Sequence, residues 1–348
     1  MAAAAARAAA PDFSLPIHRP GDARNGADET FCGKIAMASA PAGMSPAVRD
    51  GLPRQRPREL EDPLNHFIYH PLAARLARLL KPTGISPNAV SVTGALMVWV
   101  AAWAYTQLDW PQGVAIGLTF HILWHIVDGA DGDLARLTGK ASPLGELVDG
   151  VCDYIGHSAI YIGLAAMLDD RIGFWAWPLS LAAAASHAAQ TNHAESQRRS
   201  YLWWAYGVPW LKHARASGDE VFEGRNWFTR TFGWFARRYL WLATAMAPRS
   251  GGIDSAVEAA IGDRRRTGLI RRLARRASRR SLLFQKALGP NPRTLILGAS
   301  MALGSPLYFF LAEVVALNLL LAVSVRHHNI VARRMMEKLG RHPSRRDG

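Results

Sequence analysis

The chain has 348 residues, of which 41 are Lys or Arg and 27 are Asp or Glu, so its formal net charge is +14. Hydrophobic residues nevertheless make up 49% of the sequence, and 12 residues are tryptophan, a combination typical of a membrane protein with basic cytoplasmic segments. A nucleic-acid-binding protein would also be basic but would not need long uncharged apolar segments, so we expect no nucleic-acid partner. The two cysteines, Cys32 and Cys152, form no metal or redox motif and argue against a disulfide framework.

The first part of the chain carries no signal for a folded domain. Residues 1–60 are rich in Ala, Pro, Gly and charge and have no sustained apolar period, which predicts a disordered N-terminal extension without a secretory signal. Residues 70–82 then predict a short amphipathic helix that lies in the membrane interface, with leucines on one face and basic side chains beside them. The leucines are Leu72, Leu76, Leu79 and Leu80.

Six apolar segments follow, and a helix needs about 20 residues to cross a bilayer. The second and third segments reach that length only if the aspartate-containing stretch between them continues both helices, and the fifth is short. The segments are 87–106, 113–127, 154–168, 174–191, 294–303 and 306–325. The sequence therefore predicts an all-α integral membrane protein with six transmembrane helices, preceded by the interfacial helix.

The charge of the connecting segments predicts the orientation of these helices. The connections near 107–113, 168–174 and 303–306 contain one basic residue, Arg171, whereas the segments on the other side are dense in Arg and Lys. By the positive-inside rule, both termini and the aspartates face the cytoplasm. We expect a bacterial inner-membrane protein with a membrane domain over residues 64–330 and a basic C-terminal tail over 331–348.

The connection between the fourth and fifth segments, residues 206–290, is unusually long and basic. Within it, residues 227–246 mix aromatic side chains with arginines, and residues 264–286 place apolar side chains near one helical face. The latter are Ile270, Leu273, Ala277, Ser281 and Phe284. Both stretches are predicted to be interfacial helices attracted to anionic lipid. A solvated basic linker or an RNA-binding arm is the alternative, but attachment to the membrane at both ends favours the membrane surface.

Four aspartates lie between the second and third apolar segments. Asp128 and Asp131 are three residues apart and Asp149 and Asp153 are four apart, so each pair shares one face of a helix. A short turn at the sequence TGKASP would make the two helices antiparallel and bring the pairs face to face. Four such carboxylates repel one another unless cations neutralise them, and oxygen ligands favour Mg²⁺ or Mn²⁺ over zinc or copper. Two ions about 3.5–4 Å apart could hold a phosphoryl group between an attacking and a leaving oxygen.

Small residues and one arginine lie among these acids. Gly132, Ala135 and Gly145 leave room for a ligand against the helix backbones, and Arg136 offers a planar fork for phosphate or for the paired carboxylates. A single aspartate would be interpreted as a solvated helix end, and Asp133 is interpreted in this way. Four acids at paired helical spacing beside a membrane argue against that interpretation for the others.

The same stretch is similar to the signature of the CDP-alcohol phosphatidyltransferase family, D-x2-D-G-x2-A-R-x8-G-x3-D-x3-D, without any error of spacing. The matching positions are Asp128, Asp131, Gly132, Ala135, Arg136, Gly145, Asp149 and Asp153. A looser resemblance extends over residues 64–330 and includes the sequence SPN at 86–88. Residues 1–60 and 206–290 lie outside it.

The resemblance implies roles for these residues. All four aspartates would hold two Mg²⁺ or Mn²⁺ ions, and Asp153 would also deprotonate the acceptor hydroxyl. The CDP part of the donor would lie along Gly132, Ala135, Arg136 and Gly145. The implied enzyme moves a phosphatidyl group from a CDP-linked donor, first of all CDP-diacylglycerol, to a polar alcohol and releases CMP. A second mode in the family uses a CDP-amino alcohol donor and a diacylglycerol or ceramide-type acceptor. We also expect a homodimer.

The alcohol itself is not identified by the signature. The cytoplasmic end of the fourth segment is unusually polar, and Gln190, His193 and Gln197 can share a face with Arg198 close by. This face could bind a polyhydroxyl or phosphorylated acceptor, although an ordinary polar helix end is equally consistent with the pattern.

Two other classes of function compete with the enzyme. A divalent-cation transporter would also keep acids in membrane helices, but it would need them near the middle of the bilayer, whereas these lie at the cytoplasmic edge. A non-catalytic lipid-binding scaffold would keep the basic helices but would not need Asp153.

Overall fold

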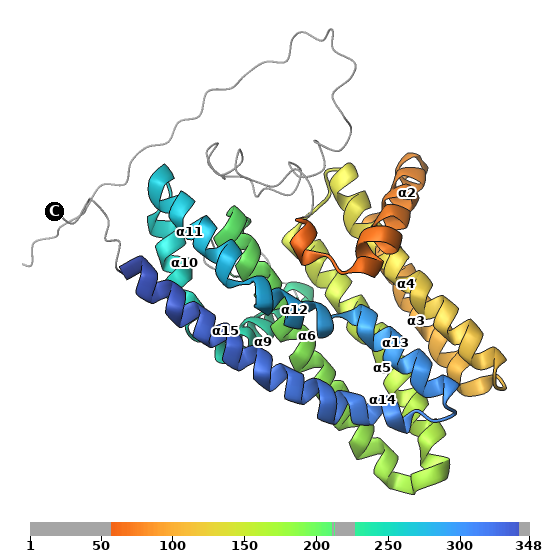
Figure 1. The fold of residues 1–348 in the computed structure, drawn as a ribbon. Helices are drawn as coiled ribbons and strands as arrows, with labels where there is room; N and C mark the ends of the chain where they lie inside the picture. The colour runs from red at the N-terminus through yellow and green to blue at the C-terminus, as the bar shows by residue number, and fades with distance from the viewer. Residues whose placement is uncertain (1–56, 211, 213–226, 341–348) are drawn as a thin grey trace, which may run out of the picture. The chain divides into compact units, whose positions relative to one another are not determined.

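The computed structural model describes residues 57–210, 212 and 227–340. Every regular element in these residues is helical, which confirms the predicted all-α class (Figure 1). Most of the predicted N-terminal extension, part of the 206–290 connection and the last eight residues lie outside the described part of the chain.

The N-terminal half of the described chain forms four long helices. They are α3 (Pro87–Gln107), α4 (Gln112–Leu137), α5 (Pro143–Ile172) and α6 (Ala176–Tyr206). Local sequence explains where α3 and α5 begin, since each starts with a proline that follows a serine N-cap. The hydroxyl oxygen of Ser86 accepts the amide of Ala89 at 3.2 Å, and that of Ser142 accepts the amide of Gly145 at 3.0 Å.

The C-terminal half of the described chain forms helices of between 5 and 24 residues. They are α9 (Trp227–Met246), α10 (Ser250–Ala259), α11 (Arg264–Ala277), α12 (Arg279–Ala287), α13 (Pro290–Ala302), α14 (Leu307–Leu311) and α15 (Leu317–Gly340). A π-helical turn, Ala312–Ala316, joins α14 to α15.

Four stretches of the described chain are long and apolar enough to cross a membrane. They are Pro87–Gln107, Gln112–Leu137, Val148–Tyr206 and Leu307–Gly340. The third contains most of α5 and all of α6, which are joined by the short helical turn Gly173–Trp175. The 13 residues of α13 extend for about 20 Å, too short to cross a hydrocarbon core of about 30 Å. The count of six spans therefore stays a prediction.

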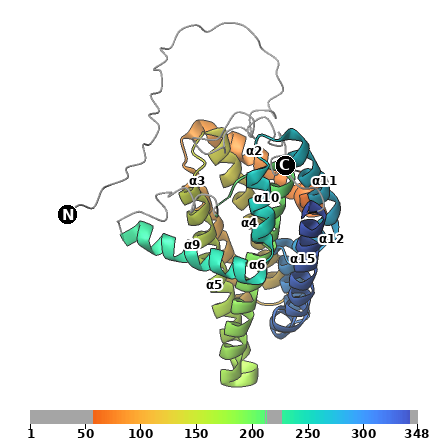
Figure 2. The same ribbon diagram turned by 90° about the vertical axis from the view of Figure 1, so that its left-hand side faces the viewer.

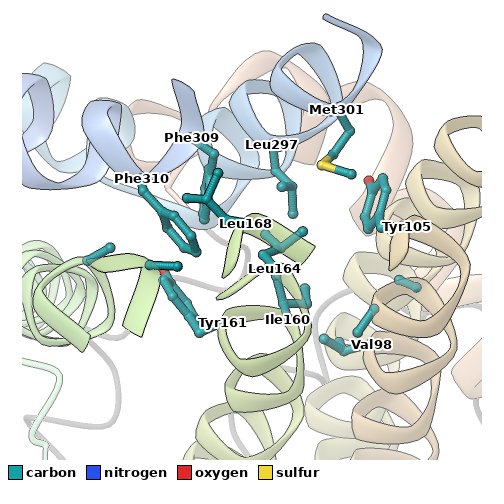
Figure 3. Close-up of a cluster of buried hydrophobic side chains, with 14 of the residues drawn as sticks. Val98, Tyr105, Ile160, Tyr161, Leu164, Leu168, Leu297, Met301, Phe309 and Phe310 are labelled. Carbon is teal, nitrogen blue, oxygen red and sulfur yellow. The ribbon is translucent and has the colours of Figure 1, made fainter. Parts of the chain in front are cut away.

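A core of buried apolar side chains joins the first helices to the last ones (Figure 3). It combines Val98 and Tyr105 of α3 and Ile160 of α5 with Leu297 of α13 and Phe310 of α14. Close approach of α3 and α4 depends on Gly117, because a Cβ atom there would lie 2.6 Å from the Tyr105 ring. Small residues at such contacts let membrane helices pack backbone to backbone.

The predicted interfacial helix is α2 (His70–Leu80). Its face against the protein is formed by Ala73 and Ala77, which are fully buried in a cluster with residues of α3 and α4. Leu76 and Leu80 pack against the same cluster, whereas Leu79 is 72% exposed. The leucines that the spacing places on one face therefore divide between two environments: Leu76 and Leu80 pack against the protein, and Leu72 and Leu79 are exposed. A position of α2 in the membrane interface stays a prediction.

The structure corrects the prediction for residues 264–286. This stretch forms two helices, α11 and α12, and the apolar face of α11 is buried inside the protein instead of facing lipid. Ile270 packs in a cluster with Leu339 of α15, and Ala274 packs in one with residues of α6, α10 and α15. Periodicity gave the correct apolar face, but it could not distinguish a protein partner from a bilayer.

Both predicted boundaries of the membrane domain also change. α15 continues through Gly340 with Val331 and Met335 buried, so the helix extends well into the predicted tail of residues 331–348. At the other end, the carboxylate of Glu59 accepts hydrogen bonds from the hydroxyls of Tyr201 and Tyr206 at 2.8 and 2.5 Å. Residues directly before position 60 are thus part of the folded protein.

Candidate functional site

A tight turn between α4 and α5 builds the site. α4 ends at Leu137, and Gly139 adopts a φ of 69°, which glycine reaches without strain. The amide of Lys140 bonds the carbonyl of Ala135 at 2.8 Å, and the amide of Gly139 bonds that of Arg136 at 3.3 Å. These two bonds form the Schellman pattern that closes a helix. α5 begins a few residues later, so the last turns of α4 lie beside the first turns of α5.

Three of the four predicted aspartates come together across this hairpin. Carboxylate oxygens of Asp128, Asp131 and Asp149 all lie within 4.8 Å of one another. Asp131 is only 5% exposed, and the hydroxyl of Ser91 on α3 donates to its Oδ2 atom at 2.5 Å. Three converging carboxylates, one of them buried, provide only oxygen ligands and concentrate negative charge. This donor set fits a hard divalent cation such as Mg²⁺ or Mn²⁺.

Asp153, the fourth aspartate, is held separately from these three. Its Oδ1 atom accepts a hydrogen bond from the indole N–H of Trp124 at 3.2 Å. Trp124 lies one turn before Asp128 on α4 and is only 4% exposed. One turn further along α5, Nδ1 of His157 is 2.9 Å from the backbone carbonyl of Asp153. The Asp153 carboxylate is therefore oriented by a buried side chain of the facing helix.

Arg136 does not point into open space. Its guanidinium forms an ion pair with Asp133, one turn earlier on α4. One of its terminal nitrogens also lies 3.5 Å from the place where a Cβ of Gly132 would be. The guanidinium is thus held against the bare backbone of Gly132, within the aspartate motif. Asp133 was interpreted as a solvated neighbour, and the structure corrects this, because its side chain is largely buried and holds Arg136 in place.

The other two small residues of the motif serve the turn itself. The carbonyl of Ala135 accepts the amide of Lys140, and the amide of Gly145 donates to the Ser142 N-cap. Both residues lie within one turn of a helix end, on either side of the turn that joins α4 to α5. Their use by a donor molecule stays a prediction.

The residues predicted for the acceptor alcohol occupy the interior of the protein. Gln190, His193 and Gln197 share one buried face of α6 as predicted, with at most 4% exposure. The rings and amides contact other protein groups: His193 and Gln197 lie 3.0 and 3.2 Å from the hydroxyl of Ser324. Arg198 instead forms an ion pair with Glu195 at 2.6 Å. The contacts seen here join α6 to α15, and an acceptor role for these residues stays a prediction.

Gln190 belongs to a buried polar network that sequence reasoning missed. Its side-chain oxygen accepts from Arg293 of α13 at 2.8 Å, and its nitrogen donates to the carbonyl of Glu313 at 3.0 Å. Arg293 also donates to the Glu313 carboxylate at 3.1 Å, and both side chains are at least 96% buried. The signal was present, since an ionisable residue within or beside an apolar segment is costly unless it is paired.

Two further residues of the site were missed for a different reason. Ser91 and Trp124 carry no charge and occur within apolar segments that predict only membrane helices. Trp124 lies four residues before Asp128, so it shares a helical face with that aspartate. The spacing could have placed it on the site face of α4, but not against Asp153.

Comparisons with known proteins agree with the motif. Residues 84–201 match the family model described as CDP-alcohol phosphatidyltransferase. The archaetidylinositol phosphate synthase of Pyrococcus horikoshii is 30% identical over 92 residues, which are 26% of this chain and 46% of that protein. Choline/ethanolaminephosphotransferase 1 of Arabidopsis thaliana is 32% identical over 127 residues, 34% of this chain and 32% of that protein. The phosphatidylinositol phosphate synthase of Mycolicibacterium smegmatis is 26% identical over 96 residues, 28% and 42% of the two chains.

The chain therefore spans less than half the length of each of these relatives. No solved structure matches it. The matched family region contains the whole aspartate motif and nearly all of the four helices α3 to α6 that carry it. Residues 84–201, which gather three of the aspartates at the α4–α5 turn, are therefore similar to the CDP-alcohol phosphatidyltransferase family.

Proposed function

We propose that the protein is a membrane-bound phosphotransferase that moves a substituted phosphate group from a CDP-linked donor to an alcohol and releases CMP. The observation that carries this proposal is the convergence of Asp128, Asp131 and Asp149 at the end of two apolar helices, in the spacing of the family. The donor proposed first is CDP-diacylglycerol and the acceptor a polar alcohol. The site would face the cytoplasm, as the Arg and Lys content of the connecting segments predicts.

The family resemblance suggests roles for this chain's own residues, and their positions are compatible with these roles. Asp153, oriented by Trp124, would take the proton of the acceptor hydroxyl while the oxygen attacks the phosphorus that bears the lipid group. The bond from that phosphorus to the CMP oxygen breaks, and CMP leaves with the electron pair. Arg136 and Gly132 would bind the diphosphate. Two Mg²⁺ or Mn²⁺ ions held by the aspartates would supply positive charge that offsets the charge of the diphosphate.

The second mode of the family stays a candidate because of a specific similarity. One of the relatives is named as a choline/ethanolaminephosphotransferase, a name that indicates transfer of an amino-alcohol phosphate. In that mode the donor would be a CDP-amino alcohol and the acceptor a diacylglycerol or ceramide-type lipid. The same proton transfer to Asp153 would be needed, so the aspartates do not distinguish the two modes.

One assay with paired substrates tests the function and its mode. The purified full-length protein is incubated with CDP-diacylglycerol and a panel of inositol, inositol phosphate, glycerol phosphate and serine, or with CDP-choline or CDP-ethanolamine and diacylglycerol. Alcohol-dependent CMP release with the first donor supports the proposal, and release only with the second supports the other mode. Lipid binding without CMP release from any pair would contradict the enzyme and favour a scaffold.

Removal of divalent cations should abolish transfer. The three converging carboxylates repel one another and the diphosphate, so without a cation neither donor binding nor charge neutralisation is expected. CMP release should fall to background in excess EDTA and return when Mg²⁺ or Mn²⁺ is added in excess of the chelator. Full turnover in EDTA would show that the aspartates do not hold a required metal.

Replacement of Trp124 by Phe should slow transfer without preventing donor binding. The change keeps an aromatic ring but removes the N–H that holds Asp153, and small errors in position cost about 10–100-fold in rate. We expect a fall in kcat of this size with little change in KM for the donor. Trp103→Phe, a change at an outward-facing position of α3, is the matched control. An equal kcat in both variants would show that Trp124 does not position Asp153 for the reaction.

A further inference from the structure

Helix α9 presents an outward face on which arginine and aromatic side chains alternate. Its inner face consists of small or aliphatic residues that are buried, namely Gly233, Ala236, Leu240 and Ala243, and it packs against α6. The outward aromatic residues are Trp234, Phe235 and Trp241, which are 50%, 47% and 64% exposed. The outward basic residues are Arg230, Arg237 and Arg238. No acidic residue occurs in the helix.

Three arginines lie around Trp234 on this face. The guanidinium of Arg238 lies 5.5 Å from the centre of the Trp234 ring, and an open groove is lined by Arg230, Thr231, Trp234 and Arg237. A groove with two guanidinium groups and an indole ring suits a phosphate attached to an apolar tail.

The orientation of α9 is unlike that of the long helices. Figure 2 shows α9 running across the direction of α5 and α6 and extending away from the bundle. It is fixed to α6 by the side-chain amide of Asn192, which donates to the carbonyl of Tyr239 at 3.0 Å. A helix that crosses the direction of membrane-spanning helices lies along the membrane plane.

The depth of α9 follows from the pairing of α5 with α6. These helices are antiparallel, with the hydroxyl of Tyr161 2.8 Å from His187. At 1.5 Å per residue, Asp153 lies about 12 Å from Tyr161 along α5, and Glu195 lies about 12 Å from His187 along α6, in the same direction. Asn192 is one turn from Glu195. α9 is therefore attached at the level of the aspartates, where the apolar helix segments end.

Helix α11 provides an internal comparison. It is also rich in arginine, but its apolar face is buried against α6, α10 and α15 and it exposes no aromatic side chain. Its arginines can interact with anions only from the aqueous side. Of α9 and α11, α9 is the one whose outward face combines cations with the indole rings that favour the interface of a bilayer.

We propose that α9 lies in the headgroup layer of the cytoplasmic leaflet and binds the phosphates of anionic phospholipids through Arg230, Arg237 and Arg238. Trp234, Phe235 and Trp241 extend between these arginines to the level of the glycerol groups. The helix thus holds anionic lipid beside the aspartate site, at the depth of that site. This role does not depend on which CDP-linked donor the protein uses.

The depth of α9 is tested by fluorescence quenching in bilayers. Full-length protein is reconstituted with lipids brominated either near the glycerol end or near the methyl end of the acyl chain. The double variant Trp234→Phe/Trp241→Phe lacks the tryptophan emission of α9, and the difference from the wild type gives that emission. Bromine near the glycerol end should quench it more strongly than bromine near the methyl end. Trp99→Phe, a change near the middle of α3, should remove a component that deep bromines quench more strongly. If the emission from α9 is quenched by neither lipid, or more by deep bromines, the proposal is wrong.

The lipid partner is tested by thermal stabilisation. A ligand that binds only the folded state raises the midpoint of unfolding, so phosphatidylglycerol added to protein in neutral detergent should raise the Tm of the wild type. The rise should be largely lost in Arg230→Gln/Arg237→Gln/Arg238→Gln. The matched triple variant of α11, Arg265→Gln/Arg272→Gln/Arg276→Gln, should keep it. Equal rises in the two triple variants, or no rise in the wild type, would contradict lipid binding by α9.

Discussion

Asp153→Asn is expected to lower the rate of CMP release by about 10²–10⁴-fold, the usual effect of removing a general base. The amide has nearly the same shape as the carboxylate, and its oxygen can still accept the hydrogen bond from Trp124. It cannot take the proton of the acceptor hydroxyl. Donor binding should change much less, because Asp128, Asp131 and Asp149 form their group without this side chain. Calorimetric titration with CDP-diacylglycerol, alongside a CMP-release assay, measures the two effects separately.

Asp131→Asn is the variant with which Asp153→Asn is compared, because it should affect binding and not only proton transfer. Asp131 lies inside the group of three carboxylates and is held by Ser91, so its loss should weaken metal and donor binding together. The two variants should therefore fail at different steps. Asp153→Asn should bind the donor without transferring its phosphate group, and Asp131→Asn should bind the donor poorly. Transfer at a near wild-type rate by Asp153→Asn would show that another group accepts the proton.

The aspartate site could be predicted from sequence because it depends on residues that are close together in the chain. Spacings of three and four residues place each pair on one helical face, and the turn between the helices is marked by Gly139 and by the Ser142 N-cap. The structure has this turn and brings together Asp128, Asp131 and Asp149, three of the four predicted carboxylates. Their use as metal ligands stays a prediction. The contact of Ser91 with Asp131 spans 40 residues, and nothing in either segment alone indicates that α3 approaches α4 at this point.

For amphipathic helices, the sequence predicts the apolar face but not what covers it. The pattern of residues 264–286 correctly predicts an apolar helical face, but an apolar face can be buried by lipid or by protein at similar gain in free energy. The partners of Ile270 and Ala274 come from α6, α10 and α15, which are distant in sequence. Those same partners explain why the domain extends past residue 330, since α15 must continue to cover α11.

The polar face of α6 is a third case, in which the pattern was correct and the partner unknown. Gln190, His193 and Gln197 lie on one buried face as their spacing predicted. Burial of polar groups requires partners, and these are Arg293, directly before the fifth segment, and Asn318 and Ser324 in the sixth. A charged residue directly before the fifth segment and a glutamate within the sixth were the sequence features that could have indicated an internal pair.

That internal pair is the basis of a prediction with a large effect on stability. The Arg293 guanidinium donates to Glu313, to Gln190 and to the backbone carbonyls at the end of α12, and Glu313 has no exposed surface. Arg293→Met should lower the free energy of unfolding by about 3–5 kcal/mol, because it leaves the Glu313 carboxylate buried without its counter-charge. Unfolding of the reconstituted or detergent-solubilised protein measures the loss.

Two controls separate this effect from simple loss of a charge. Arg333 and Glu337 form an exposed ion pair on α15 with an N–O distance of 3.7 Å, and Arg333→Met should cost only about 0.5 kcal/mol or less, as exposed pairs of this spacing do. The double variant Arg293→Met/Glu313→Met should be more stable than the sum of the two single losses predicts, because neither charge is then left alone. Additive losses, or an Arg293→Met variant as stable as Arg333→Met, would mean that the pair does not hold α13 to the last helix. The network that buries Gln190 would then need another explanation, and the face of α6 would again be a candidate for the acceptor alcohol.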